Sequence, residues 1–395
     1  MPSFSATGLL DLRVALTGKS VSWEDRGLGK TRFGAATDGN NRVIARIAEA
    51  SLIVKGDLTW DISGVAHVIA GAQQEHPIDL VEAYLDYHPV PTSRYGIRGR
   101  AGAFFPTISL ENTGLGWTSP FTISSSAINS WVGEELRTFG AELTAFRTGD
   151  DIDVSLTGSV YYANDPAGTI LTWRGWAIHD RKSGIFEKIP LAPVRIIRPG
   201  GILDNQAPYV APLAEIDDRA GYYVGANVEH HDFGSLHLLY YDNSADDREI
   251  EGGQWAWLTR FLSVGLKTEL PANVDLVAQY LKGRTSVITI PPPTGPISRT
   301  HYDSLFFLVS KTWGQHRVSA RWEHFATHDR DRFPDNNSET GHGLTLAYVF
   351  YPVAKQRLTL ELLHVRADRP ERTLSFNLPA KWHDTQIQAS YRFFF

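Results

Sequence analysis

Polar and apolar residues alternate along this chain in stretches of about ten residues or more. From Gln386 to Phe393, Gln, Gln, Ser and Arg fall on one face of an extended chain, and Ile, Ala, Tyr and Phe fall on the other. Residues 153–160 and 357–362 repeat this pattern, and a period of two is the side-chain period of a β-strand. Soluble sandwiches alternate in the same way, so the period alone predicts strands without fixing what surrounds them.

The number and length of these stretches favour a membrane barrel. Most of them reach the roughly nine to eleven residues that a tilted strand needs to cross a bilayer, whereas ordinary soluble strands average about five or six. The sixteen expected strands are 5–16, 42–55, 57–70, 77–88, 94–105, 136–148, 150–162, 218–231, 233–242, 253–267, 272–283, 300–313, 315–326, 340–351, 355–366 and 384–395.

The connections between these stretches alternate between tight turns and long polar segments. Short turns on the periplasmic side and long loops outside are the pattern of outer-membrane barrels. An even number of strands keeps every long segment on the same side. The long segments are 17–41, 106–135, 163–217, 243–252, 284–299, 327–339 and 367–383, with 70–77 as the one short member of the set.

Composition excludes several other kinds of protein. No apolar run approaches the roughly eighteen residues of a membrane-spanning helix, and the absence of cysteine rules out disulfides and thiolate metal sites. A net charge of −6 argues against nucleic acid as a partner. The first residues lack the charged and apolar regions of a secretion signal, so we expect an exported chain from which the signal peptide has already been removed.

The chain ends in the amphipathic sequence Ser390-Tyr391-Arg392-Phe393-Phe394-Phe395. This ending resembles the terminal strand of bacterial outer-membrane proteins, which their assembly machinery recognises. The resemblance implies that Tyr391, Phe393 and Phe395 form an assembly signal and that the barrel-assembly machinery is a partner. It also implies a location in the outer membrane of a Gram-negative bacterium, in contact with membrane lipid and lipopolysaccharide.

Taken together, these features resemble the superfamily of general and phosphate-selective porins over the whole chain. In sixteen-stranded porins the loop after the fifth strand folds inward and narrows the pore, and here that connection is 106–135. The resemblance implies an all-β fold, with residues 1–395 forming one transmembrane antiparallel barrel with an inward constriction loop, and it implies a homotrimer. Segment 163–217 is too apolar in places for a solvated loop. It either folds into the lumen or adds a hairpin, giving eighteen strands; we prefer sixteen.

Arg94, Arg98 and Arg100 fall on one face of the fifth expected strand. A charge facing lipid near the bilayer midplane costs a barrel about 2–4 kcal/mol, so this face should line the lumen. Arginines opposite acidic residues would set a transverse field that orients polar solutes. Four acids are expected to share this constriction with the three arginines, and they are Glu111, Glu134 and Glu135 of the inward loop and Glu142 of the next strand.

These patterns predict a porin-like channel for passive diffusion of small hydrophilic solutes or ions. They indicate no enzyme, catalytic residue, cofactor or metal. The alternative is a channel selective for phosphate, a sugar or an aromatic acid; a barrel enzyme or a plugged scaffold is less favoured. Acidic residues crowd 327–339, and oxygen-rich loops can hold Ca²⁺. Their spacing fits no EF-hand, so solvated charge is the preferred interpretation.

A closed sheet satisfies every backbone polar group internally and should therefore resist detergent. We expect unboiled and boiled protein to migrate at different positions on a detergent gel, with a β-type circular dichroism spectrum for the unboiled form. Substantial helix content, or one migration position for folded material, would contradict the barrel.

Overall fold

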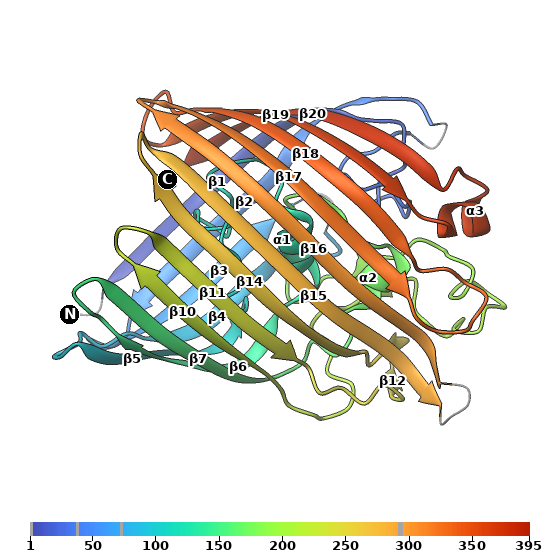
Figure 1. The fold of residues 1–395 in the computed structure, drawn as a ribbon, viewed down its shortest axis with the longest axis horizontal. Helices are drawn as coiled ribbons and strands as arrows, with labels where there is room; N and C mark the ends of the chain where they lie inside the picture. The colour runs from blue at the N-terminus through green and yellow to red at the C-terminus, as the bar shows by residue number, and fades with distance from the viewer. Residues whose placement is uncertain (1–2, 37–38, 72–73, 291–294) are drawn as a thin grey trace.

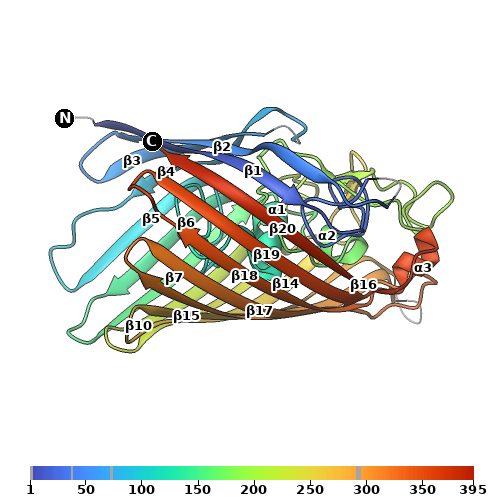
Figure 2. The same ribbon diagram turned by 90° about the horizontal axis from the view of Figure 1, so that it is seen from above.

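The computed structural model describes residues 3–36, 39–71, 74–290 and 295–395. Within these residues, sixteen strands pair antiparallel with their neighbours and close into a barrel, because β1 pairs with both β2 and β20 (Figures 1 and 2). The sixteen-strand prediction is confirmed. The barrel strands are β1 (Phe4–Leu16), β2 (Val43–Asp57), β3 (Ile62–Ala70), β4 (Ile78–Tyr87), β5 (Tyr95–Phe104), β6 (Thr138–Arg147), β7 (Ile152–Tyr162), β10 (Gly221–His230), β11 (Gly234–Asp242), β14 (Leu258–Leu270), β15 (Val274–Ile290), β16 (Gly295–Trp313), β17 (His316–Asp329), β18 (Glu339–Phe350), β19 (Gln356–Asp368) and β20 (Lys381–Phe394).

The alternating pattern places polar residues inside the barrel and apolar residues outside. In β20, Gln386, Gln388 and Arg392 are buried on the inner face, whereas Ile387 and Phe393 are exposed on the outer face. An apolar outer band and a polar interior are what a barrel surrounded by lipid requires. The short turns and both termini lie at one end, called here the short-turn end, and the long segments lie at the other (Figure 1).

Two expected loops differ from the prediction. Most of 284–299 is strand, because β15 and β16 continue their pairing beyond Arg284, for example between Ser286 and Arg299. The run Thr285 to Ile290 is rich in β-branched residues, which favour the extended chain. The expected turn between the second and third strands is also longer than predicted, because β3 begins at Ile62 instead of residue 57. Positions 37–38, 72–73 and 291–294 of the expected loops lie outside the described residues.

Segment 163–217 adds no strand to the barrel. It contains the helix α2 (Thr169–Trp173) and the two-residue strands β8 (Ile189–Pro190) and β9 (Tyr209–Val210), which pair only with each other. A similar small pair, β12 (Ile250–Glu251) and β13 (Gln254–Trp255), lies between β11 and β14. The eighteen-strand alternative is therefore wrong, because β7 pairs directly with β10 and the segment between them adds no barrel strand.

Two further helices complete the described structure. Helix α1 (Ala127–Glu135) begins at Ser126, whose hydroxyl accepts a hydrogen bond from the Asn129 backbone N–H, as an N-cap residue should. Helix α3 (Glu371–Phe376) lies at the long-loop end (Figure 1). Among the described residues, none of the helices is both long and apolar enough to cross a bilayer.

The last residue of the chain takes part in closing the barrel. The backbone N–H of Phe395 donates to the Gly8 carbonyl at 3.0 Å, and the Gly8 N–H donates to the Phe395 carbonyl at 2.9 Å. The Phe395 ring lies where a Cβ on residue 8 would be, so Gly8 makes room for it. Phe393 and Phe395 are exposed on the outer surface, as an assembly signal would need to be.

We predict that replacing Phe395 by Asp reduces assembly in cells far more than it lowers the stability of refolded protein. The backbone bonds at the seam do not need the ring, whereas recognition by an assembly machinery does. Membrane levels of the variant and its migration after refolding measure the two effects separately. Phe233→Asp, at an exposed aromatic in the turn between β10 and β11, is the control. Equal membrane levels of the Phe395 variant and the parent would show that this residue is not a signal.

Candidate functional site

Two segments of the chain enter the lumen and are buried there. All residues from 121 to 138, including α1, and all residues from 163 to 179, including α2, are buried. Both helices lie inside the ring of strands in two perpendicular views (Figures 1 and 2). The inward fold expected for 106–135 is therefore present, and a second segment accompanies it.

The first segment is held by acidic side chains that project from the far wall. The Glu361 carboxylate in β19 accepts hydrogen bonds from the backbone N–H groups of Ile123 and Ser124 at 2.5 and 3.0 Å. Glu323 in β17 accepts one from Ala127 N at 2.6 Å, at the start of α1, where a negative charge also interacts well with the helix dipole. These bonds satisfy backbone N–H groups at the start of α1 and just before it, which have no partner within the helix.

Arg321 connects the wall to the base of the same segment. Its guanidinium lies 3.1 Å from the Glu111 carboxylate and 3.0 Å from Glu323. Glu111 in turn accepts from the Ser126 N–H at 2.6 Å and from the Asn129 side-chain amide at 2.8 Å. All of these carboxylates are buried, and removing one partner from such a pair costs about 3–5 kcal/mol because the other charge is left uncompensated. Glu111 therefore has a clear structural role.

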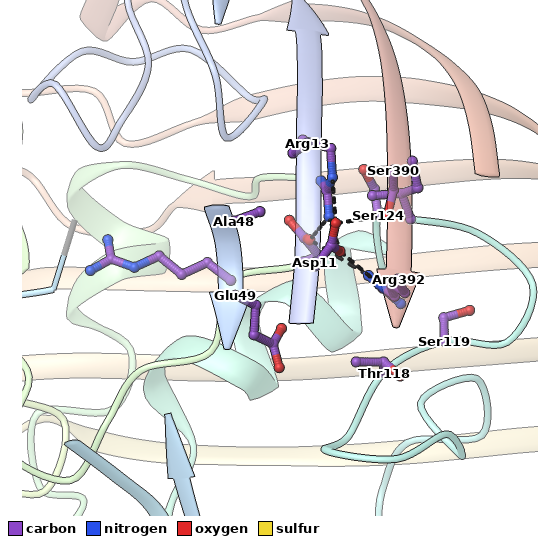
Figure 3. A network of polar contacts seen from close by, with 12 residues as sticks. Asp11, Arg13, Ala48, Glu49, Thr118, Ser119, Ser124, Ser390 and Arg392 are labelled. Atoms are coloured by element: carbon purple, nitrogen blue, oxygen red, sulfur yellow. Dashed lines mark hydrogen bonds and ion pairs between the residues drawn. The ribbon is translucent and has the colours of Figure 1, made fainter. Parts of the chain in front are cut away.

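The second segment is anchored at the seam between β1 and β20. Asp180 accepts from Arg13 of β1 at 2.7 Å and from Arg32 at 3.2 Å. Arg13 and Arg392 both bind Asp11, at 2.7 and 2.6 Å (Figure 3). Although burial opposes ionisation, the two guanidinium groups of Arg13 and Arg32 hold the pKa of Asp180 well below its usual range. The aspartate is therefore charged, and the seam holds the segment by ion pairs.

Glu134 and Glu135 link the two lumenal segments to each other. Arg174 forms a two-pronged contact with Glu134, at 2.9 and 2.5 Å, and His179 Nε2 lies 3.0 Å from the same carboxylate. Burial alone would raise the pKa of Glu134, but Arg174 and His179 lower it to about 2. The ion pairs of the described residues do not include Glu135, which accepts from the Ile170 backbone N–H at 2.9 Å and from the Trp131 indole. Burial raises its pKa to about 7.

The predicted constriction residues are only partly brought together. Arg100 lies 2.9 Å from Glu142, which is also bonded to Thr107 of the inward loop and to Tyr223 of β10. Arg98, two residues earlier, lines a cavity together with Arg100 and Glu142. Glu111, Glu134 and Glu135 bind other partners, as described above. They hold the segments in place instead of facing the three arginines.

Arg94 is the clearest departure from the prediction. It precedes β5, lies in the turn at the short-turn end and pairs with the exposed Asp150 of the neighbouring turn at 2.8 Å. The strand begins one residue too late to place Arg94 on the inner face, so the pattern of alternation was extended one step too far. The sequence does not identify Asp180 or Arg174 as binding residues, because the sequence of a loop does not show which residues its side chains will meet in the folded chain.

A cavity of about 420 Å³ lies between the barrel wall and the start of the inward loop. Arg98, Arg100, His237 and Asn227 line it from strands β5, β11 and β10, and Thr107 and Ser109 line it from the loop. Most of these side chains carry hydrogen-bonding groups or charge. The cavity therefore offers polar surface at the side of the lumen where the inward loop begins.

Comparison with solved structures identifies the same fold in outer-membrane proteins. The outer membrane channel DcaP of Acinetobacter baumannii has a TM-score of 0.61 and 9% identity, covering 100% of this chain and 97% of its own. A loop-deletion variant of OmpT, an outer membrane protein of Vibrio cholerae, has a TM-score of 0.57 and 10% identity, with coverages of 100% and 99%. The anion-selective porin from Comamonas acidovorans has a TM-score of 0.53 and 12% identity, covering 100% of this chain and 100% of its own.

No protein-family model and no curated protein matches the sequence. At these identities the structural likeness establishes the fold alone: the chain is a porin-type barrel of sixteen antiparallel strands. What each of those proteins carries or binds is a separate question for this chain.

We predict that the local stability of the α1–α2 contact falls as pH rises from about 4.5 to 7. Glu135 has a raised pKa, so the packed state keeps a proton that the opened state releases in this range, and the stabilisation is lost as pH passes the packed-state value. Hydrogen exchange of the α1 and α2 amides, corrected for the intrinsic rate, should show protection decreasing about tenfold or more.

Glu135→Gln should make the dependence of protection on pH flatter than in the parent, because it removes the titrating carboxyl and leaves the other ionisable groups in place. Glu134→Gln is the matched control: it should lower protection at every pH above about 4.5, since it leaves Arg174 without its partner. Identical pH profiles for the parent and Glu135→Gln would contradict the assignment.

Proposed function

We propose that this chain is an outer-membrane channel of a Gram-negative bacterium for the passive diffusion of small hydrophilic solutes or ions. The observation that carries the proposal is the cavity of about 420 Å³ beside the inward loop, whose lining combines charged and polar side chains with apolar ones, inside a closed barrel with an apolar outer surface. A polar lumen in a lipid-facing barrel is the arrangement of porins. DcaP, which shares the fold, is described as an outer membrane channel.

The solute path in this proposal is narrow and runs along the cavity side of the lumen. Segments 121–138 and 163–179 are buried inside the barrel, and the cavity lies beside the start of the inward loop. Arg98 is exposed to the cavity, and the ion pairs among the described residues include none with it. Arg100, by contrast, is neutralised by Glu142. One unpaired guanidinium supports a modest preference for anions over cations.

Selective binding of phosphate, a sugar or an aromatic acid has less support. A selective pore needs several like-charged or stacked aromatic side chains in sequence along the path. Only Arg98 and Arg100 of the expected arginines line the cavity, and acids such as Asp86 line it too. We therefore propose a general pathway, with no catalysed reaction. We also propose membrane lipid, lipopolysaccharide and the barrel-assembly machinery as partners, and a homotrimer as the assembly.

We predict that Arg98→Ser lowers the chloride-to-potassium permeability ratio by about twofold at low salt, where screening is weakest. The substitution removes the unpaired positive charge beside the path and leaves the Arg100–Glu142 pair intact. Single-channel recordings in planar bilayers under a salt gradient give the ratio. Arg94→Ser is the matched control, since Arg94 lies in an exposed turn paired with Asp150, and it should leave the ratio unchanged.

The same recordings distinguish a channel from a plugged scaffold. A parent protein that is folded but passes no current would overturn the proposed function and favour a barrel whose lumen is closed by its own segments. Equal effects of Arg98→Ser and Arg94→Ser would instead place the conducting path away from the cavity.

A further inference from the structure

Three carboxylates meet where the two ends of the lumenal segment 163–217 leave the barrel wall. Asp165 follows β7, and Glu215 and Asp217 precede β10, the strand that pairs with β7. One carboxylate oxygen from each residue lies within 4.8 Å of those of the other two. The cluster is formed by residues fifty positions apart in sequence, so the fold itself assembles it.

Backbone N–H groups fix the orientation of all three side chains. Ile216 N donates to Asp165 Oδ2 at 2.6 Å, Ala163 N donates to Glu215 Oε2, and Arg219 N donates to Asp217 Oδ1 at 3.0 Å. The second oxygens of two of the carboxylates are then left over. Asp165 Oδ1 and Glu215 Oε1 are buried and have no hydrogen-bond partner among the described residues. The Asp165 residue is only 1% exposed.

The neighbouring cations are engaged elsewhere. Arg219 pairs with Asp246 at 2.6 Å and Arg260 pairs with Asp242 at 2.8 Å, and no ion pair in the described part of the chain includes Asp165, Glu215 or Asp217. A buried carboxylate oxygen without a donor or cation is costly. Burial, with the nearby charges of Glu215 and Asp217, raises the pKa of Asp165 to about 7.

We propose that Asp165, Glu215 and Asp217 bind a calcium ion that clamps the two ends of the lumenal segment together. A cluster of carboxylate oxygens with no nitrogen or sulfur donor suits a hard cation, and Ca²⁺ accepts irregular sets of six to eight oxygens. Backbone carbonyls and water would complete the shell. Mg²⁺ is less suitable because it demands near-ideal octahedral geometry and gives up its water reluctantly.

The site would also reach the next long-loop connection. Asp217 Oδ2 accepts a hydrogen bond from the backbone N–H of Asp246, and Trp257 N donates to the Asp165 carbonyl at 2.8 Å. A cation here would therefore fix the segment that carries α2 relative to both β7 and the region between β11 and β14. This role is independent of whether the barrel conducts.

A second acidic group, formed by Asp329, Asp331 and Asp335, provides a comparison. Both oxygens of Asp329 and of Asp331 accept backbone N–H bonds, from Asp331 and Asn337 and from Arg299 and Phe333 respectively. Only Asp335 Oδ1 is buried without a partner. This group already has donors for most of its oxygens, so it serves as the control cluster.

Terbium luminescence in refolded, lipopolysaccharide-free protein tests the proposal. Tb³⁺ replaces Ca²⁺ at oxygen sites, and Trp257, whose backbone contacts Asp165, can sensitise its emission. The parent should give a saturable signal that Ca²⁺ displaces and that Mg²⁺ displaces far less. Asp165→Asn with Glu215→Gln should weaken binding at least tenfold, a loss of about 1.4 kcal/mol or more. Asp331→Asn with Asp335→Asn should retain the signal.

A second measurement keeps the test independent of folding defects. Without Ca²⁺ the double variant at the proposed site should be at least as resistant to heat as the parent, because neutral amides remove the repulsion; added Ca²⁺ should stabilise only the parent. If the double variant fails to fold, Glu215→Gln alone should still weaken Tb³⁺ binding. Unchanged affinity in these variants, loss only in the control pair, or no Ca²⁺ binding by the parent at millimolar concentration would overturn the proposal.

Discussion

The structure depends on one constraint: a backbone surrounded by lipid has no water to bond, so each N–H and C=O must find a partner within the sheet. Sixteen antiparallel strands meet it by closing β1 onto β20. Closure gives the sheet an inner and an outer face, and the alternation of side chains along each strand then puts Leu12 and Val14 outside and Asp11 and Arg13 inside. The polar lumen is therefore a consequence of the closed sheet, and its charges must be matched by whatever fills it.

The lumenal segments supply that match. Their backbone amides and charged side chains bind wall residues such as Glu361, Glu323 and Arg13. Buried ion pairs add little net stability, because desolvation offsets much of their attraction. Their geometry is nevertheless demanding, and a misplaced segment would leave several charges without partners. The pairs thus select one position for α1 and α2 among the many that a wide barrel would allow.

Sequence reasoning recovered the barrel because period and strand length are local properties. All sixteen strands were located, with boundary errors where a β-branched run such as 285–290 extended a strand or a turn shortened one, as at Ile62. The site was recovered less well. Arg98, Arg100 and Glu142 line one cavity, but Arg94 lies outside the strand. Asp180 binds residues that only the folded chain brings close. Alternation shows which face a residue occupies, whereas the partner it meets depends on the path of a loop.

The seam between the first and last strands also has a consequence for how the barrel forms. β1 can complete its pairing only when β20 arrives, and the final residue, Phe395, makes two of the closing bonds. Such a contact spans nearly the whole chain, so sealing the barrel costs more loop-closure entropy than forming a hairpin between neighbouring strands. Until then both outer strands present unpaired edges, which are templates for aggregation. β20 must therefore reach β1 before the barrel can be sealed, and a chain that lacked β20 would keep an open, adhesive edge.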